Sequence, residues 1–404
     1  MARFAWLRMV AALLLALVFI AALASCRPRD SVQLVVPELV RTHLYVAPHG
    51  DDSDPGTRKE PFRTLARAAQ VATAGTTVHV APGSYSGGLR TTAHGTAEAR
   101  IVFRSTERWG ARVVPPLTAR QGAAWDIRGN YVDIVGFEID GAQYQSGMRW
   151  QTGIYVGGAH GGVHGNRVRH IATDGPCDER GGAGIVADSL HKGIDAVISG
   201  NVVHDIGAPG CRDMHGIGVG ARATAQGNVV YRVAGAAIHL WHDASHVVVR
   251  ANTVVASSIG ILVGAGDFHQ GAGPNDHTRV ERNIVYDNGL GIMEHGATGP
   301  DNRFSNNLVH ANAEGDWRLA DGRRHTGTID APPQFADYTL EDRPAHMPAH
   351  MPAHMPAHMP DFRLRPGSPA LGRLPRAGTG PPGAATALRE AAIGALPAAP
   401  PPAA

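Results

Sequence analysis

Short runs of alternating apolar residues recur along the middle of the chain, and each begins at an asparagine. These asparagines are spaced 35, 27, 24, 31 and 24 residues apart: Asn166, Asn201, Asn228, Asn252, Asn283 and Asn307. A second apolar run, in which glycine or alanine precedes isoleucine, follows each of the first five, and a third precedes each asparagine. Because alternating β-branched residues are typical of half-buried strands, the pattern predicts three short strands per repeat.

Three strands in a repeat of about 24 residues predict one coil of a solenoid, in which inward side chains stack on the next coil. The asparagine at a fixed turn is expected to stack its amide on its neighbours and to satisfy backbone groups of the turn. Glycine is frequent, at 50 residues, and suits turns that need positive φ. Aromatic residues make up only 6% of the chain, which argues against a helical bundle.

These repeats resemble the right-handed parallel β-helix superfamily, the pectate-lyase-like fold, over about Trp125 to Asn312. The segments 44–57, 61–69 and 78–85 resemble the opening segment of bacterial β-helix proteins, and 333–335 and 361–370 resemble their closing strands. The resemblance implies an all-β, right-handed parallel β-helix solenoid with a short N-terminal capping helix over Arg63 to Ala72. A leucine-rich-repeat solenoid would need a Leu-x-x-Leu-x-Leu frame, which the sequence lacks.

We expect seven segments along the chain. They are a lipoprotein signal peptide (1–25), a linker (26–42), the N-terminal cap segment of the β-helix (43–115), the coils (116–337), a loop with four Ala-His-Met-Pro repeats (338–360), a closing strand (361–375) and a disordered Ala/Pro tail (376–404).

The first 26 residues have the form of an export signal. Arg3 and Arg8 precede an apolar run that is short for a membrane span, and Leu23-Ala-Ser-Cys26 resembles the bacterial lipobox. That resemblance implies lipidation of Cys26 and a lipid anchor in the cell envelope. Because Arg27 stands where aspartate would signal inner-membrane retention, we expect an outer-membrane or periplasm-facing protein. The alternatives are an ordinary secretory signal or a membrane anchor.

The two remaining cysteines, Cys177 and Cys211, lie in Gly/Pro-rich insertions on the same edge of consecutive coils. Export places them where disulfides persist, so a disulfide between them is the first interpretation. Two free thiols and a Cys/His metal site are the alternatives.

The charge of the chain disfavours nucleic acid as a partner. The formal net charge is +2, and two of the basic residues lie in the predicted leader. Nucleic-acid binders normally carry a basic face, and no dense Lys/Arg cluster occurs here. We expect a monomer whose partners are a polysaccharide and, through Cys26, a membrane.

The glycine-isoleucine runs predict which side chains face outward. Because isoleucine points inward, the residue after it and the residue two positions further point outward. The first outward column contains Tyr155, Val186, Gly218, His239, Leu262 and Met293, and the second contains Gly157, Asp188, Gly220, Trp241, Gly264 and His295. We assign substrate binding to Trp241, Tyr155, His242, Asp188 and His295.

The segment 237–243 carries the densest candidate chemistry. His239 and Trp241 should share the outer face of one strand, with His242 and Asp243 at its end. An indole suits the C–H face of a sugar ring, and imidazole can act as a general acid or base near neutral pH. The alternative is a histidine pair that faces solvent or caps a turn.

Long insertions are expected to form walls beside this face. The next strand isoleucine is 19 residues from Asn166 and 16 from Asn201, against 10, 9 and 9 in the following three coils. A further insertion covers 264–277. Insertions of solenoids tend to lie on the binding face, so we expect a groove over His239 and Trp241. Tolerated drift of surface loops is the alternative.

The resemblance also implies a class of reaction. β-helix polysaccharide lyases abstract the proton α to a uronate carboxyl group, which needs a base and a cation for the carboxylate. We name His239, Arg232 and His215 as catalytic candidates, with Lys192 as a further candidate by residue type. Arg232 is equally suited to binding a carboxylate with two hydrogen bonds. The paired aspartates of polygalacturonases and the Asp-Pro-His motif of mannuronan epimerases are absent from the sequence.

Calcium is a candidate cofactor, since oxygen ligands from several loops can hold it. Asp178, Glu179 and Asp213 would form such a site if the two cysteine-bearing insertions pack together, and solvated acids are the alternative. The Ala-His-Met-Pro repeats suit Cu(I), although an expanded surface loop also explains them.

Three functions therefore stay open at this point. The first is a lyase or epimerase acting on an acidic polysaccharide. The second is a non-catalytic cell-surface β-helix that binds glycan or has a structural role. The third is a periplasmic copper-handling protein.

Overall fold

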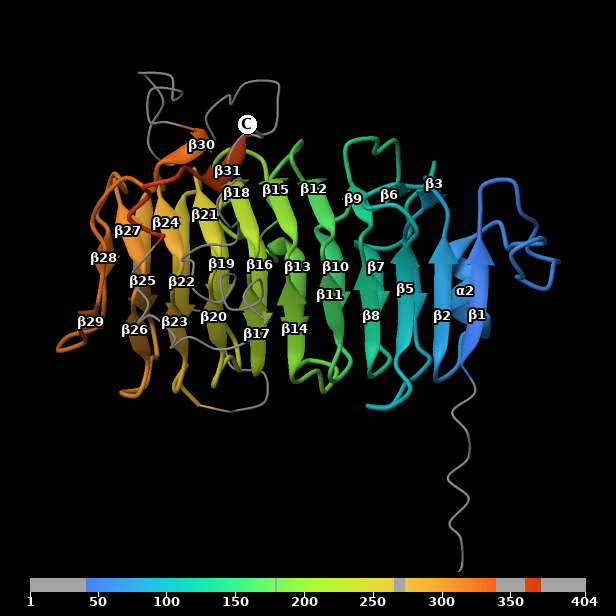
Figure 1. Ribbon diagram of the computed structural model, residues 1–404, viewed down its shortest axis with the longest axis horizontal. Helices are drawn as coiled ribbons and strands as arrows, with labels where there is room; N and C mark the ends of the chain where they lie inside the picture. Colours follow the sequence, from blue (N-terminus) through green and yellow to red (C-terminus); the bar gives the residue numbers. More distant parts are fainter. Residues whose placement is uncertain (1–40, 179, 265–272, 339–359, 372–404) are drawn as a thin grey trace, which may run out of the picture. The chain divides into compact units, whose positions relative to one another are not determined.

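The computed structural model describes residues 41–178, 180–264, 273–338 and 360–371, and three long parallel sheets make up most of this part (Figure 1). Sheet A contains β1 (Thr42–Val46), β2 (Thr76–Val80), β5 (Ile101–Ser105), β8 (Val132–Val135), β11 (Gly162–His164), β14 (Ala196–Ser199), β17 (Ala223–Gln226), β20 (Val248–Arg250), β23 (Arg279–Glu281), β26 (Arg303–Ser305) and β29 (His325–Thr326).

Sheets B and C each contribute one strand to most coils. Sheet B contains β3 (Gly83–Ser86), β6 (Ala111–Val114), β9 (Glu138–Asp140), β12 (Arg167–Ile171), β15 (Val202–Ile206), β18 (Val229–Val233), β21 (Thr253–Val255), β24 (Ile284–Tyr286) and β27 (Leu308–His310). Sheet C contains β4 (Leu89–Thr91), β7 (Ala123–Ile127), β10 (Thr152–Val156), β13 (Gly182–Asp188), β16 (Met214–Gly220), β19 (Ala236–Leu240), β22 (Ile259–Gly264), β25 (Leu290–His295) and β28 (Trp317–Arg318).

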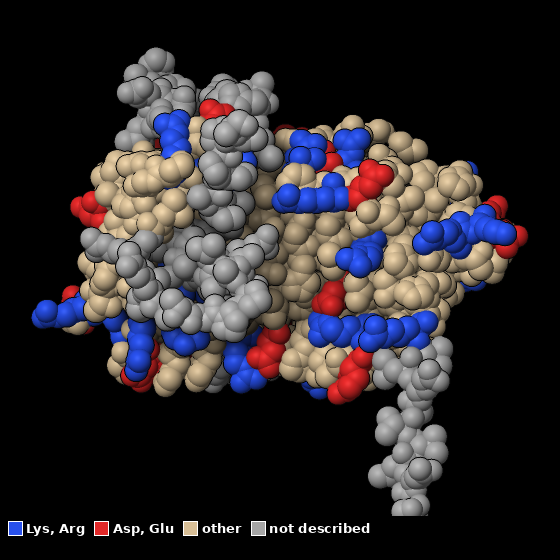
Figure 2. Space-filling view, in the orientation of Figure 1, with Lys and Arg blue, Asp and Glu red and all other residues tan. Residues whose placement is uncertain are grey.

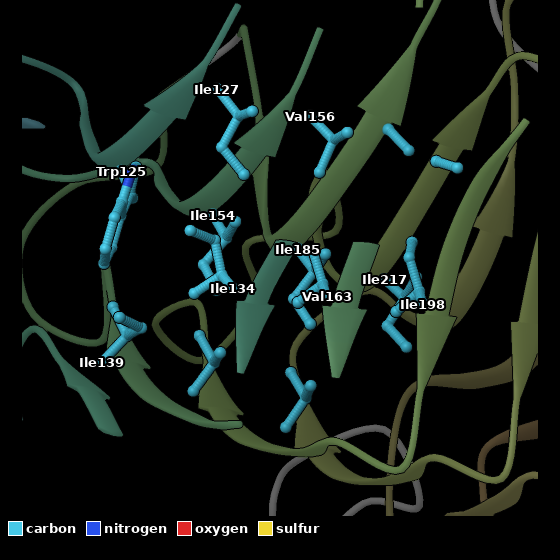
Figure 3. Close-up of a cluster of buried hydrophobic side chains, with 14 of the residues drawn as sticks. Trp125, Ile127, Ile134, Ile139, Ile154, Val156, Val163, Ile185, Ile198 and Ile217 are labelled. Atoms are coloured by element: carbon cyan, nitrogen blue, oxygen red, sulfur yellow. The ribbon is translucent and has the colours of Figure 1, made fainter. Parts of the chain in front are cut away.

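The core is a column of side chains that repeats once per coil. On sheet C, Ile154 pairs in register with Trp125 and Ile185, and the column continues to Ile217 and Ile238. All five side chains are fully buried, and Figure 3 shows the first four stacked between the sheets. The inward register predicted from the glycine-isoleucine runs is therefore confirmed.

The predicted asparagine ladder is also confirmed. The six asparagines are completely buried, and each of the first five donates its backbone N–H and its Nδ2 to Oδ1 of the next, at 2.9–3.1 Å. Each Nδ2 also donates to a strand carbonyl, as Asn228 does to Ile198. The ladder thus satisfies the buried polar groups of the turn between sheets A and B, coil after coil.

A small residue, glycine or alanine, precedes each inward isoleucine of sheet C, and at two glycines the space is especially tight. A Cβ added to Gly184 would lie 2.6 Å from Cγ1 of Val203, and one added to Gly216 would lie 2.4 Å from Cγ1 of Val230. These contacts are closer than real Cβ atoms tolerate, so Gly184 and Gly216 are packing requirements, whereas β19 accommodates Ala237 at the equivalent position.

The N-terminal end carries the expected helix, α2 (Leu65–Val71), slightly shorter than predicted. Thr64 caps it by accepting a hydrogen bond from the Arg67 N–H, and Asp52 accepts from the N–H groups of Arg63 and Thr64. Among the described residues, no helix has the length and apolar character needed to cross a membrane.

At the other end, β30 (Phe335–Asp337) and β31 (Asp361–Leu364) form an antiparallel pair. Phe335 and Phe362 pack with Tyr231 and Tyr286 of sheet B in one buried cluster. The predicted signal peptide with Cys26, the Ala-His-Met-Pro repeats and the C-terminal tail lie outside the described residues.

Candidate functional site

The outer face of sheet C brings together most of the side chains that the sequence singles out. Backbone pairing aligns Tyr155 with Val186, Gly218, His239, Leu262 and Met293, as the first predicted outward column requires. Asp188 pairs with Gly220, and Gly264 pairs with His295, which places members of the second column in register. The predicted outward register of sheet C is therefore confirmed.

His215 and His239 form a directed chain of hydrogen bonds across two coils. The Ala236 N–H donates to His215 Nδ1 at 3.1 Å, so that nitrogen carries a lone pair. His215 Nε2 then donates to His239 Nδ1 at 3.0 Å, and His239 Nε2 donates to the Gly264 carbonyl at 3.1 Å. Each ring thus carries one proton, and every ring nitrogen is occupied within the protein.

Burial keeps both rings neutral. His215 and His239 are only 6% and 5% exposed. Desolvation lowers the pKa of His239 to about 4 and lowers the pKa of His215 well below its usual value. A general base needs a lone pair that reaches the substrate, and neither imidazole offers one in this arrangement.

Trp241 lies across two glycines of the preceding strand. A Cβ added to Gly218 or Gly220 would stand 3.7 or 3.5 Å from the indole Nε1, so the indole nitrogen lies close to the backbone of both glycines. The indole is tilted against the His239 ring at a centroid separation of 5.6 Å, and the His242 ring centre lies 3.7 Å from that of the indole. The predicted pair of His239 and Trp241 thus exists as a packed aromatic group rather than as two separate side chains.

A second group on sheet C lies toward the N-terminal coils. Arg90 and Arg128 both donate to the carboxylate of Asp126, at 2.8 and 2.5 Å. Asp126 is aligned with Tyr155 on the next strand, and the Arg128 guanidinium lies 4.9 Å from the Tyr155 ring centre. The repeat analysis missed these three charged residues, although the Trp125-Asp126 pair repeats the isoleucine-tyrosine pattern of β10.

Tyr155 links this group to the rest of the face. Its hydroxyl donates to Asp188 Oδ1 at 2.6 Å, and Asp188 also accepts from the Leu190 N–H. Burial and the neighbouring Asp188 charge raise the pKa of Tyr155, so the phenol keeps its proton at neutral pH. Ser189, the next residue, donates to Asp243 at 2.6 Å. We call Arg90, Asp126, Arg128, Tyr155 and Asp188 the arginine–tyrosine row.

The cysteine-bearing insertions meet at the amino ends of the sheet C strands. Cys177 and Cys211 form the disulfide predicted as the first interpretation, with Cα atoms 5.2 Å apart. The Gly182 N–H donates to the Asp213 carbonyl, which joins the first insertion to the second. The insertion between β22 and β23 is described only in part, and its residues Asp267 and His269 lie outside the described residues.

Arg232, named from the sequence as a catalytic candidate, lies on sheet B and not on this face. It is the fourth residue of β18 and has a positive φ of 54°. Its Nη2 lies 2.5 Å from Oδ2 of Asp205. Burial by itself raises the pKa of Asp205. Hydrogen bonds and charges from His204 and Arg232 outweigh this effect and lower the pKa to about 2. Alternation of side-chain direction is interrupted at a strand residue with positive φ, and Arg232 lies in a charged cluster on sheet B.

The acids proposed for calcium lie in these two cysteine-bearing insertions. Asp178 receives hydrogen bonds from the backbone and guanidinium of Arg180, which lowers its pKa. Asp213 is exposed, and Glu179 lies outside the described residues. Among the described residues, the acids and histidine that come together most closely as potential ligands are Asp276, His277 and Asp301, within 4.8 Å of one another.

Basic and acidic side chains are interspersed on the face shown in Figure 2, with no continuous basic field on it. This distribution agrees with the small net charge of the chain, +2.

Two family models match the chain: "Pel9A-like, right handed beta helix region" over residues 44–177 and "Right handed beta helix region" over residues 152–326. Together with the three parallel sheets, these matches decide the fold. The chain is a right-handed parallel β-helix protein.

Relatives cover only parts of this β-helix protein. It is 34% identical over 139 residues to the uncharacterized protein YwoF of Bacillus subtilis (strain 168), which is 32% of this chain and 29% of the relative. It is 34% identical over 73 residues to pectate lyase PEL9 of Emericella nidulans, 18% of each chain. The chain therefore spans less than a third of the length of these relatives.

Solved structures share the fold over more of the chain. Pectate lyase Pel9A superimposes with a TM-score of 0.56, covering 90% of this chain and 98% of that one at 14% identity. A glycoside hydrolase gives a TM-score of 0.51, covering 72% and 95% at 10% identity. At such identities the likeness shows the β-helix fold alone.

Proposed function

We propose that this β-helix protein acts on an acidic polysaccharide bound along the outer face of sheet C. The observation that carries the proposal is the arginine–tyrosine row, in which two guanidinium groups stand beside a tyrosine–aspartate pair on an outward strand face. The local similarity to a pectate lyase and the shared fold with pectate lyase Pel9A support this substrate class.

Arg90 and Arg128 supply the positive charge that a uronate carboxylate needs. Their side chains are 50% and 27% exposed, whereas Asp126 beneath them is 7% exposed. The guanidinium groups therefore face outward over a buried carboxylate that orients them. Planar guanidinium groups bind carboxylates with paired hydrogen bonds, so this arrangement favours carboxylated over neutral sugars.

Tyr155 and Asp188 form a hydrogen-bonded pair that can transfer protons, and the Asp188 carboxylate has a second oxygen, Oδ2, besides the Oδ1 that accepts from Tyr155 and Leu190. In the elimination we propose, Asp188 removes the C5 proton of the uronate, the C4–O bond breaks as the C4=C5 bond forms, and Tyr155 protonates the departing oxygen. The hydrogen bond between the two residues then returns the proton from Asp188 to the Tyr155 oxygen. If Tyr155 instead returns a proton to C5, the same pair performs epimerisation.

A non-catalytic, glycan-binding role is the second candidate. The observation that favours it is the neutral His215–His239 pair, whose nitrogens are all engaged within the protein. Export through a lipid anchor on Cys26 is part of both proposals, since extracellular polysaccharide would then be within reach.

The test is turnover of a panel of polyuronates, followed by the ultraviolet absorbance of unsaturated uronate ends. Tyr155→Phe should lower the rate by about 100-fold or more while leaving binding within about twofold, because the phenol contributes to proton transfer. Tyr131→Phe, directly before β8 of sheet A, is the matched control and should keep the native rate. Binding without turnover or epimerisation across the panel would instead establish the non-catalytic role.

A further inference from the structure

A pocket of about 420 Å³ opens at the amino ends of three neighbouring sheet C strands. Gly122, Gln151 and Gly181 line it, and each directly precedes a strand: β7, β10 and β13 respectively. The same three strands carry Asp126, Tyr155 and Asp188 further along. From Gln151 to Tyr155 the extended chain covers about 13 Å, so the pocket lies at one border of the arginine–tyrosine row.

Arg149 gives this pocket a guanidinium with unused hydrogen-bonding capacity. Its Nη1 lies 2.9 Å from Asp174 Oδ1, yet this buried nitrogen makes no hydrogen bond of good geometry with any described residue. The guanidinium is held over the Tyr144 ring at 4.9 Å, while Asp174 is 72% exposed. Exposed ion pairs are weak, so a ligand carboxylate can take the place of Asp174.

Arg180 supplies a second guanidinium at the mouth of the pocket. It is 87% exposed and pairs with Asp178, which also lines the pocket. Because the Arg180 side chain extends into solvent, it can reach a ligand without movement of the backbone. The cost is the loss of freedom of that one side chain.

The remaining wall is apolar. Met148 lines the pocket and is 54% exposed, one of the few large apolar side chains at the surface of the described residues. Gly122 lies beneath it, since a Cβ added there would be 3.4 Å from the Met148 sulfur. An exposed thioether beside a guanidinium offers a sugar ring an apolar surface for its C–H face and a cation for its carboxylate.

The disulfide fixes the wall that carries Asp178 and Arg180. Cys177 directly precedes Asp178, and its bond to Cys211 ties this insertion to the next coil. Closing the loop covalently reduces the ordering that a ligand would otherwise have to impose. Small-ligand sites typically enclose about 300–1,000 Å³, a range that includes this pocket.

We propose that this pocket is a subsite for a further uronate residue of the polysaccharide, with Arg149 and Arg180 binding its carboxylate and Met148 packing against its ring. This subsite rests on the proposed function, because it extends the same chain beyond the arginine–tyrosine row. It predicts that affinity increases with oligomer length until the pocket is filled.

The test is calorimetric titration of the whole protein with oligogalacturonates of increasing length and with their carboxyl-reduced, neutral counterparts. Arg149→Gln and Arg180→Gln should each lower affinity for the longest acidic oligomer by about tenfold and remove the gain with length. Both should leave the shortest oligomer within about twofold. Arg250→Gln, an exposed arginine on β20 that bonds Gln226, is the matched control and should bind like the native protein.

The possible outcomes distinguish failure of the subsite from failure of the proposed function. One outcome is that Arg128→Gln weakens binding, whereas Arg149→Gln and Arg180→Gln leave it unchanged at every oligomer length. This result would overturn the subsite and keep the proposed function. Absence of oligouronate binding by the native protein would overturn both. Because Arg180 is exposed, Arg180→Gln tests the pocket even if Arg149→Gln lowers the melting temperature.

Discussion

Replacement of Asn228 by alanine is expected to destabilise the β-helix by about 4 kcal/mol. Its Oδ1 accepts from the backbone N–H and the Nδ2 of Asn201, and its Nδ2 donates to Ile198 and Asn252. Alanine removes all four bonds from a completely buried position and leaves groups on both neighbouring coils without partners. Each buried polar group left without a hydrogen-bond partner costs about 1–3 kcal/mol of folding free energy.

Chemical denaturation measures this loss. Gln226→Ala is the matched control, because it removes an amide that bonds Arg250 on the surface of sheet A, and it should cost less than about 1 kcal/mol. Equal destabilisation by the two variants would show that the asparagine ladder does not hold the coils together.

Acidification from pH 7 to pH 4 is expected to remove about 3 kcal/mol of stability through His239 alone. Its folded pKa is lowered from 6.5 to about 4, so in this window the unfolded chain binds a proton that the native state does not. Stability is therefore fully present above about pH 6.5 and is lost as the pH falls toward 4. Asp205, with a pKa of about 2, titrates below the window.

His239→Gln separates this effect from general acid denaturation. A glutamine amide can still accept from His215 and donate to the Gly264 carbonyl, but it does not titrate. The variant should show a shallower loss of stability between pH 6.5 and 4 than the native protein. The same slope in both proteins would contradict the buried, neutral histidine pair.

The repeat could be predicted from the sequence because equivalent positions of successive coils have the same packing and hydrogen-bonding requirements. Ile185 and Ile217 lie in register and Asn201 stacks on Asn228, as the spacing required, since every coil must fill the same core and satisfy the same turn. The regular spacing of inward residues therefore predicts both the fold and which residues of sheet C face outward.

The site could be predicted only in part. Periodicity placed His239 outward, but neighbouring coils bury it to 5% exposure, and burial from adjacent coils leaves no periodic signal. Arg232 has a positive φ within β18, which interrupts the alternation of side-chain directions, so the pattern does not predict its contact with Asp205. Arg90 and Arg128 precede the regular asparagine repeats, so no spacing pointed to their meeting at Asp126.

The most direct test of the account is equilibrium binding of polygalacturonate to the native protein and to the double variant Arg90→Gln/Arg128→Gln, with Arg250→Gln as control. The account predicts binding by the native and control proteins and a loss of about 10- to 100-fold in the double variant, at unchanged melting temperature. Equal affinity of all three proteins would contradict an acidic polysaccharide site on the outer face of sheet C.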